Sequence, residues 1–214
     1  MNSQSARRAK QCTSSWIIVA HPDDEIIFAG CAILANPNLA WNIVISTHSA
    51  DSRRGKEARA VEQALIAMGI DVRYYFLGHS DERAAINGGI VREKFVSQVS
   101  ALPIARDARI FTHGADGEYG HIGHKAVHRF VCACWAQNEI WTFARGTLHC
   151  APLLLQAKRK LFRDCYTSQA GAWKNLEGTM NRLMFDGEGH VRWKPGPRAF
   201  LPRLLRTSLL KDIP

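Results

Sequence analysis

The sequence of 214 residues lacks a long hydrophobic run, although 46% of its residues are hydrophobic. No stretch approaches the roughly 20 consecutive apolar residues that a membrane-spanning helix needs. The amino terminus also lacks the apolar centre that marks a signal peptide. These two absences predict a cytoplasmic protein.

The six cysteines lack both the spacing of a disulfide framework and a Cys-x-x-Cys motif, which fits a reducing compartment. The sequence also lacks internal repeats and low-complexity segments. Its length is sufficient for one hydrophobic core. We therefore expect a single domain over residues 13–214, preceded by a polar, disordered tail over residues 1–12.

Positive charge exceeds negative charge, mainly near the carboxyl terminus. The formal net charge is +9, and residues 145–214 contain thirteen Lys or Arg against five Asp or Glu. A basic surface beside an active site favours an anionic substrate. The basic segment at about residues 199–214 could lie on an anionic membrane or pack as a closing helix, which we favour. No nucleic-acid-binding motif occurs, so nucleic acid is not expected as a partner.

Strand-like and helix-like patterns alternate along the chain. Apolar runs typical of strands occur at residues 16–20, 42–46, 72–77, 108–112 and 140–143. Helical patterns occur at about residues 25–35, 54–68, 89–101 and 122–137. This alternation predicts an α/β fold, a Rossmann-like three-layer sandwich with a mostly parallel central sheet.

The densest group of polar residues lies at residues 20–25, which read Ala-His-Pro-Asp-Asp-Glu. It follows a strand-like run and precedes a helical pattern, so it falls where open α/β sheets place their ligand sites. Three crowded carboxylates are costly without a cation. Neutral imidazole and ionised carboxylate are both good ligands for a divalent transition metal, so this turn predicts part of a metal site.

A second dense segment, at residues 113–128, contains four histidines, an aspartate and a glutamate. It too follows a strand-like run and precedes a helical pattern. The two segments therefore occupy equivalent positions, and we expect their side chains to meet at one edge of the sheet.

Together, these segments resemble the LmbE-like, or PIG-L, family of zinc-dependent de-N-acetylases, which remove acyl groups from amino sugars. The family's Ala-His-Pro-Asp-Asp-Glu pattern stands intact at residues 20–25, and its Gly-His-x-x-His pattern stands at residues 120–124. A looser resemblance extends from about residue 16 to residue 169.

The resemblance implies a role for five residues. His21, Asp24 and His124 would hold the metal, zinc with iron as the alternative, and leave a position open for water. Asp23 would act as the general base. His121 would polarise the substrate carbonyl or protonate the leaving amine.

The resemblance also points to two substrate contacts. Arg54 is the nearest match to the family's Arg-x-x-Glu at a helix start, and Asp81 matches an aspartate that contacts sugar hydroxyls. The competing interpretations are a solvated helix start for Arg54 and an ordinary loop residue for Asp81.

Other residues of these segments have competing interpretations. His128 lies four residues after His124, so it could replace His121 or Asp24 in a rival ligand set, or pack behind a ligand. Glu25 could orient a ligand or take part in catalysis. His113 is expected to end a strand near the pocket. Four histidines outside the two motifs are expected to have no carboxylate partner and to be structural or exposed: His48, His79, His149 and His190.

The sequence therefore predicts a metal-dependent hydrolase that removes an N-acetyl, or related acyl, group from an amino-sugar conjugate. We expect this small-molecule substrate to carry phosphate, a nucleotide or a lipid pyrophosphate. An amidase acting on a thiol-linked sugar conjugate is one alternative. A basic, non-catalytic anion-binding protein with a vestigial metal site is another, but the intact pair Asp23 and His121 speaks against it. The oligomeric state does not follow from the sequence.

Overall fold

The computed structural model describes residues 14–82, 84–145, 150–169 and 185–194. The tail expected at residues 1–12, His149, and the basic segment at about residues 199–214 lie outside the described residues.

The described strands form one six-stranded sheet in the order β3-β2-β1-β4-β5-β6. Strands β1 to β5 pair in parallel, and β6 runs antiparallel to β5 at one edge. The strands are β1 Ser14–Val19, β2 Ala40–Thr47, β3 Val72–His79, β4 Arg109–Thr112, β5 Glu139–Arg145 and β6 Glu188–Arg192.

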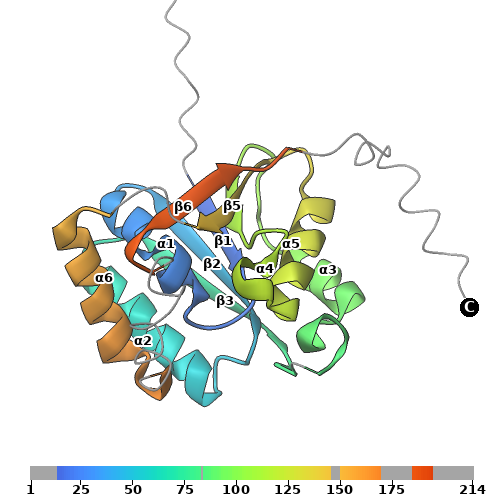
Figure 1. Cartoon of the computed structure of the whole chain (residues 1–214), viewed down its shortest axis with the longest axis horizontal. Helices are drawn as coiled ribbons and strands as arrows, with labels where there is room; N and C mark the ends of the chain where they lie inside the picture. The colour runs from blue at the N-terminus through green and yellow to red at the C-terminus, as the bar shows by residue number, and fades with distance from the viewer. Residues whose placement is uncertain (1–13, 83, 146–149, 170–184, 195–214) are drawn as a thin grey trace, which may run out of the picture.

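Helices cover both faces of this sheet, with α1, α2 and α6 on one face and α3, α4 and α5 on the other (Figure 1). The helices are α1 Asp24–Ala35, α2 Arg53–Ala67, α3 Arg92–Ser100, α4 Gly117–Gly120, α5 Ile122–Cys134 and α6 Pro152–Cys165, and the short 3-10 helices are η1 Ile86–Gly89 and η2 Thr167–Gln169. The predicted α/β sandwich with a mostly parallel sheet is confirmed.

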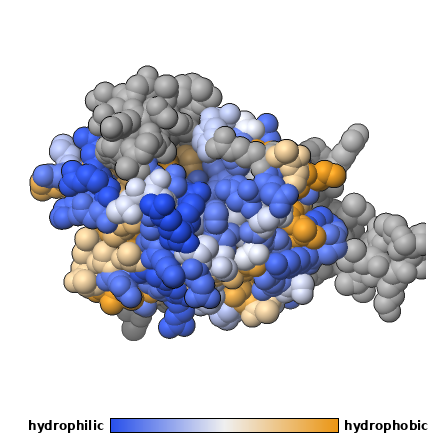
Figure 2. All heavy atoms as spheres, turned by 90° about the horizontal axis from the view of Figure 1, so that it is seen from below, coloured by the Kyte–Doolittle hydropathy of each residue, from blue (hydrophilic) through white to orange (hydrophobic). Residues whose placement is uncertain are grey.

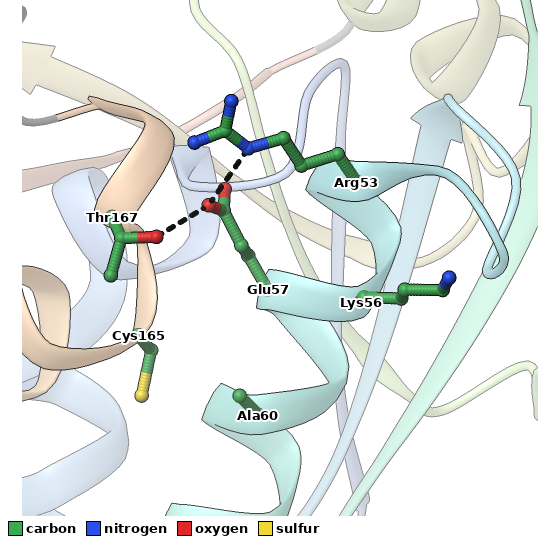
Figure 3. A pocket seen from close by; sticks show the side chains of 6 residues that line it. All are labelled: Arg53, Lys56, Glu57, Ala60, Cys165 and Thr167. Carbon is green, nitrogen blue, oxygen red and sulfur yellow. Dashed lines mark hydrogen bonds and ion pairs between the residues drawn. The ribbon is translucent and has the colours of Figure 1, made fainter.

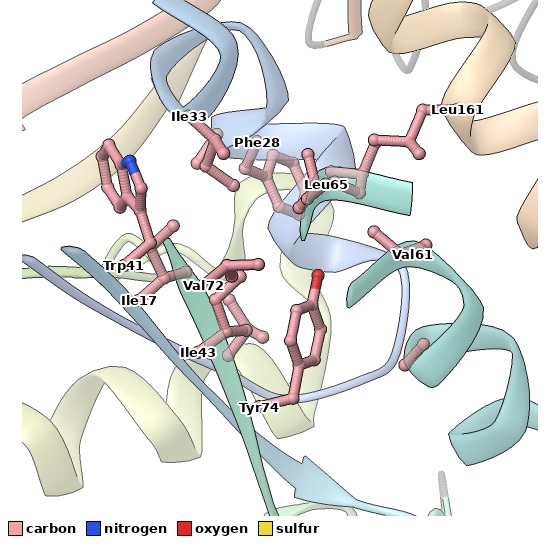
Figure 4. Close-up of a cluster of buried hydrophobic side chains, with 14 of the residues drawn as sticks. Ile17, Phe28, Ile33, Trp41, Ile43, Val61, Leu65, Val72, Tyr74 and Leu161 are labelled. Carbon is pink, nitrogen blue, oxygen red and sulfur yellow. The ribbon is translucent and has the colours of Figure 1, made fainter. Parts of the chain in front are cut away.

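Two hydrophobic clusters fill the space between the layers. Figure 4 shows the cluster in which Ile17 and Ile43 of the sheet meet Phe28 of α1, Val61 of α2 and Leu161 of α6. The second cluster joins the opposite sheet face to α3 and α5. Because both faces of the central strands are covered, their apolar residues run almost without interruption, as is typical of parallel sheets.

Some elements differ from the sequence prediction. Helix α3 begins at Arg92 instead of residue 89, because Gly89 has a positive φ of 85° that a right-handed helix cannot include, and Val91 before the helix is extended. Helix α5 ends at Cys134 instead of residue 137. Strand β6 and helix α6 were not predicted as elements.

The sheet has a topological switch point between β1 and β4. The chain moves outward from β1 through β2 to β3 and then returns to β4 on the other side of β1. Ligand sites of open α/β sheets lie at the carboxyl ends of the strands at such a point. Both predicted motifs follow these two strands.

Among the described residues, no helix is both long enough and apolar enough to span a membrane. The face of the molecule in Figure 2 is mostly hydrophilic and carries separate small hydrophobic patches.

Candidate metal centre

The first motif forms a strained turn between β1 and α1. Asp23 precedes the helix with φ 107° and ψ −29°, and its side chain makes no capping hydrogen bond. A left-handed conformation of a non-glycine residue costs roughly 1–3 kcal/mol and persists only where its surroundings enforce it. Here Glu25 accepts a hydrogen bond from the Asp23 backbone N–H at 3.0 Å, and the hydroxyls of Tyr74 and Tyr166 donate to the same buried carboxylate. Glu25 therefore orients the turn.

Three side-chain atoms from the two motifs form a nearly equilateral triangle. His21 Nδ1 lies 3.2 Å from Asp24 Oδ2 and 3.2 Å from His124 Nε2, and the last two atoms lie 3.4 Å apart. Ligand atoms at a tetrahedral zinc ion with bonds of about 2.0–2.1 Å lie about 3.3–3.4 Å apart. All three residues are buried. The spacing and the donor types thus fit a zinc ion.

His121 lies beside this triangle at the start of α5. Its ring centroid is 4.6 Å from those of His21 and His124, and its Nδ1 accepts a hydrogen bond from the Gly123 backbone N–H at 3.2 Å. His21, His121 and His124 could also hold a metal ion together, because their candidate ligand atoms lie within 4.8 Å of one another. His121 is half-buried, whereas His124 is fully buried.

His113 and His128 lie behind the triangle. His113 Nε2 accepts a hydrogen bond from the Ala20 backbone N–H at 3.0 Å, and its Nδ1 lies 3.0 Å from Glu118 Oε2, so both ring nitrogens have partners. His128 Nδ1 donates to the His113 carbonyl at 2.8 Å. Among the described residues, no group with the spacing of a metal site includes His128. The rival ligand set weighed for His128 is therefore not formed.

Arg54 reaches the turn of the first motif from α2. Its guanidinium donates to Asp23 Oδ2 at 2.6 Å and to the Pro22 carbonyl. Gly55 lets the start of α2 pack against the loop after β2, because a Cβ there would lie 2.0 Å from the Ser49 carbonyl oxygen. Arg54 thus contacts the proposed base, and its contact with a substrate stays a prediction.

Asp81 enters the site from the loop after β3. Its two oxygens lie 3.3 Å from His21 Nε2 and 3.5 Å from His48 Nε2. The expectation that His48 has no carboxylate neighbour was wrong, because β2 and β3 are adjacent and their carboxyl ends bring the two loops together. A contact between Asp81 and a sugar also stays a prediction.

The electrostatics of the cluster favour positive charge. Although burial lowers the pKa of His21, hydrogen bonds to Asp24 and Asp81 outweigh it and raise that pKa to about 9. Burial opposes the ionisation of Asp24, but the charges of His124 and His113 hold its pKa well below the usual value. A site that stabilises a proton on His21 and an ionised Asp24 also favours a metal cation.

The pKa values of two neighbouring carboxyl groups, Asp23 and Glu118, shift in opposite directions. Burial raises the pKa of Asp23 to about 8, although the charge of Arg54 acts to lower it. Burial also acts to raise the pKa of Glu118, but His113 and His124 overcome it and lower that pKa to about 2.

Two kinds of residue were missed by the sequence interpretation. Glu118 contacts both His113 and His124, and only its place in the second motif could have indicated it. Tyr74 and Tyr166, which bind Glu25, lie far from either motif, and no local signal identifies them.

Two further clusters lie away from this centre. A pocket of about 470 Å³ opens between α2 and α6, and its lining is Arg53, Lys56, Glu57, Ala60, Cys165 and Thr167 (Figure 3). In this pocket the Thr167 hydroxyl donates a hydrogen bond to the Glu57 carboxylate at 3.0 Å. Elsewhere Cys31, Cys150 and Glu188 lie close together, but the Lys158 ammonium group already neutralises Glu188 at 2.7 Å.

Comparisons with known proteins identify a family and related folds. The PIG-L family model, described as GlcNAc-PI de-N-acetylase, matches residues 16–135, which include both motifs. The uncharacterized protein L374 of Acanthamoeba polyphaga mimivirus is 24% identical over 155 residues, which cover 67% of this chain and 67% of that protein.

Two solved structures share the fold. An inhibitor-bound N,N'-diacetylchitobiose deacetylase from Pyrococcus horikoshii is 18% identical with a TM-score of 0.64, and the match covers 86% of this chain and 85% of that one. The conserved protein TT1542 from Thermus thermophilus is 20% identical with a TM-score of 0.55, and the match covers 89% of this chain and 98% of that one.

Proposed function

The chain belongs to the PIG-L family of GlcNAc-PI de-N-acetylases, and we propose that it is a zinc-dependent hydrolase that removes an N-acetyl group from an amino-sugar conjugate. The observation that carries this proposal is the triangle formed by His21 Nδ1, Asp24 Oδ2 and His124 Nε2, whose edges of 3.2–3.4 Å suit one zinc ion.

His21, Asp24 and His124 would hold the ion in this proposal. When bound, zinc with three protein ligands lowers the pKa of a bound water to about 7 and polarises a carbonyl. Iron is the alternative metal. The buried carboxylate of Asp24 would also offset the charge of the cation.

Asp23 would accept the proton of the attacking water. Its carboxylate is next in sequence to a proposed ligand, and Arg54 holds its Oδ2 at 2.6 Å. Asp23 Oδ2 pairs with Arg54, whereas Asp24 Oδ2 lies beside His21 and His124, so the neighbouring carboxyl groups can serve different roles. Oxygen would add to the amide carbon as this proton moves to Asp23.

His121 would act on the opposite side of the reaction. Its position beside His21 and His124, with ring centroids 4.6 Å away, would let its Nε2–H stabilise the charge that develops on the amide oxygen, while Nδ1 accepts from the Gly123 backbone N–H. When the carbon–nitrogen bond breaks, the leaving amine needs a proton, which His121 would give. The products would be acetate and the free amino sugar.

The substrate would be anionic in this proposal. The chain carries a formal net charge of +9, which favours a sugar linked to phosphate, a nucleotide or a lipid pyrophosphate. A screen of zinc-loaded protein for acetate release from nucleotide-, lipid- and thiol-linked N-acetyl sugars tests this assignment. Preference for a thiol-linked conjugate would favour the amidase alternative, and no release from any of them would contradict the enzyme.

The base assignment is tested by Asp23→Asn. This change keeps the shape of the side chain but removes the proton acceptor, so acetate release should fall by about 10²–10⁴-fold while bound zinc stays stoichiometric. Asp51→Asn, an exposed aspartate in the loop before α2, is the matched control and should stay active. An active Asp23→Asn enzyme would remove Asp23 from the base role.

A further inference from the structure

Two residues outside the proposed ligand set close a ring of polar contacts around two of its members. Asp24 Oδ2 lies 3.3 Å from His113 Nε2, His113 Nδ1 lies 3.0 Å from Glu118 Oε2, and Glu118 Oε2 lies 2.6 Å from His124 Nδ1. The ring closes where His124 Nε2 lies 3.4 Å from Asp24 Oδ2. All four residues are buried.

Glu118 is held in this ring from several directions. Its Oε1 accepts a hydrogen bond from the Gly114 backbone N–H at 2.6 Å, and its own N–H donates to Asp116 Oδ1 at 3.2 Å. Its backbone has φ 60° and ψ −65°, a strained conformation for a non-glycine residue. These hydrogen bonds and this backbone conformation hold the Glu118 carboxylate in a buried position, between His113 and His124.

The contact between Glu118 and His124 determines which nitrogen of His124 carries a proton. A carboxylate at 2.6 Å accepts a hydrogen bond from Nδ1–H, and the lone pair of the neutral imidazole is then on Nε2. That is the atom that faces His21 and Asp24. Metal-binding histidines commonly pair their second nitrogen with such an acceptor, which also increases their basicity.

His113 restrains the imidazole of His124 by stacking. Its imidazole stacks on that of His124 with centroids 3.8 Å apart and an angle of 15° between the planes. This contact limits rotation of the His124 ring, while the two Nδ1 atoms share Glu118 Oε2. His113 and Glu118 therefore restrain His124 both in angle and in tautomer.

We propose that Glu118, supported by His113, is a positioning residue that presents the Nε2 lone pair of His124 to the metal. This inference rests on the zinc site of the proposed function. It assigns Glu118 no contact with the substrate or the ion.

Zinc affinity of the full chain separates this role from a purely structural one. Glu118→Gln keeps the size of the side chain but removes the charge, and it should raise the zinc dissociation constant by about 10–100-fold in competition with a chromophoric chelator. Glu57→Gln is the matched control, because Glu57 is also a buried carboxylate that accepts hydrogen bonds, from Thr167 and Ser168, but lies outside the ring. Equal zinc affinity of Glu118→Gln and wild type would overturn the proposal.

A second measurement needs no variant. Long-range proton–nitrogen NMR spectra of the zinc-free wild-type chain should show a proton on Nδ1 of His124 and none on Nε2. A proton mainly on Nε2 would overturn the proposal even if Glu118→Gln failed to fold. A chain that binds zinc through His124 but releases no acetate would contradict the proposed function and leave the role of Glu118 intact.

Discussion

Unusual backbone conformations concentrate around the proposed metal centre. Among the described residues, the non-glycine positions with positive φ are Asp23, His48, Asn87 and Glu118. The Asp23 side chain contacts Arg54, and that of His48 contacts Asp81. The Glu118 side chain contacts the imidazoles of His113 and His124. Strain of this kind is retained where a side chain must point in one direction, so these residues mark the site independently of its sequence motifs.

The Arg54 guanidinium should matter for rate and not for metal binding. Arg54→Ala removes the partner that holds Asp23 Oδ2 at 2.6 Å, so the proposed base loses its orientation. We expect acetate release to fall by at least about 10-fold, as for a misplaced catalytic group, with unchanged zinc content. Arg53→Ala is the control, because this neighbouring side chain is 76% exposed. If both variants kept full activity, Arg54 would have no part in catalysis.

The ligand assignment separates His124 from His128. His124→Ala should lose the bound zinc, because Nε2 of His124 is one corner of the triangle. His128→Ala should keep stoichiometric zinc, since His128 Nδ1 binds the His113 carbonyl instead. Elemental analysis of the two purified variants measures the difference. Zinc retained by the first variant and lost by the second would reverse the assignment.

At this scale, the sequence proposed ligands and a base more readily than it proposed the residues that orient them. Crowded imidazole and carboxylate groups in two strand-end motifs predicted a metal site there, and the resemblance to the family implied His21, Asp24 and His124 as its ligands. Glu118 could not be chosen over its neighbours, since its role depends on a left-handed backbone angle that a non-glycine residue seldom adopts.

Helix α6 connects the carboxyl-terminal part of the fold to the first motif. At its end, the Tyr166 hydroxyl donates to Glu25 of α1. Within the helix, the fully buried Lys158 ammonium group donates to the Ile27 carbonyl at 2.7 Å and to Glu188 of β6 at 2.7 Å. Helix α6 and strand β6, both distant in sequence, thereby support α1 and the turn before it.

The link between α6 and α1 predicts a stability effect. Tyr166→Phe removes one of the donors to the buried Glu25 carboxylate, and it should lower the free energy of unfolding by about 1–3 kcal/mol. Tyr75→Phe is the control, because the half-buried Tyr75 hydroxyl makes only a 3.4 Å contact with Asn42. Urea titration of the zinc-free proteins measures both. An unchanged midpoint for Tyr166→Phe would show that this hydrogen bond does not stabilise the turn.

Elements were predictable where one pattern dominated. Strands β1, β2 and β4 are apolar runs bounded by polar turns, because both of their faces are buried. Strand β6 reads Glu-Gly-His-Val-Arg and is an edge strand, so it has no such run. The apolar side of α6 packs against α1 and α2. The local sequence of this segment did not predict a helix.

In the whole molecule, the proposed ion would join two halves of the sheet. His21 and Asp24 follow β1, whereas His124 belongs to the segment after β4, which the chain reaches only after completing β2 and β3. The alternating pattern predicted a parallel sheet but not the order of its strands, because the choice of neighbours for β1 depends on long-range packing. The equivalent positions of the two motifs, each after a strand-like run, predicted that they share an edge.

Metal removal should therefore destabilise the fold as a whole. A ligand that binds only the folded state adds about 4.1 kcal/mol when its free concentration is 1,000 times its dissociation constant. Calorimetry should show a lower melting temperature after chelation and recovery when zinc is added back. His124→Ala serves as the control, since its melting temperature should not respond to zinc. An identical response of wild type and variant would place the ion elsewhere.

The most direct test of the proposed metal centre is anomalous diffraction at the zinc edge from crystals of the full chain. We expect one strong peak within about 2.0–2.2 Å of His21 Nδ1, Asp24 Oδ2 and His124 Nε2. A peak held by His121 in place of Asp24, or a peak away from these three atoms, would contradict the central claim.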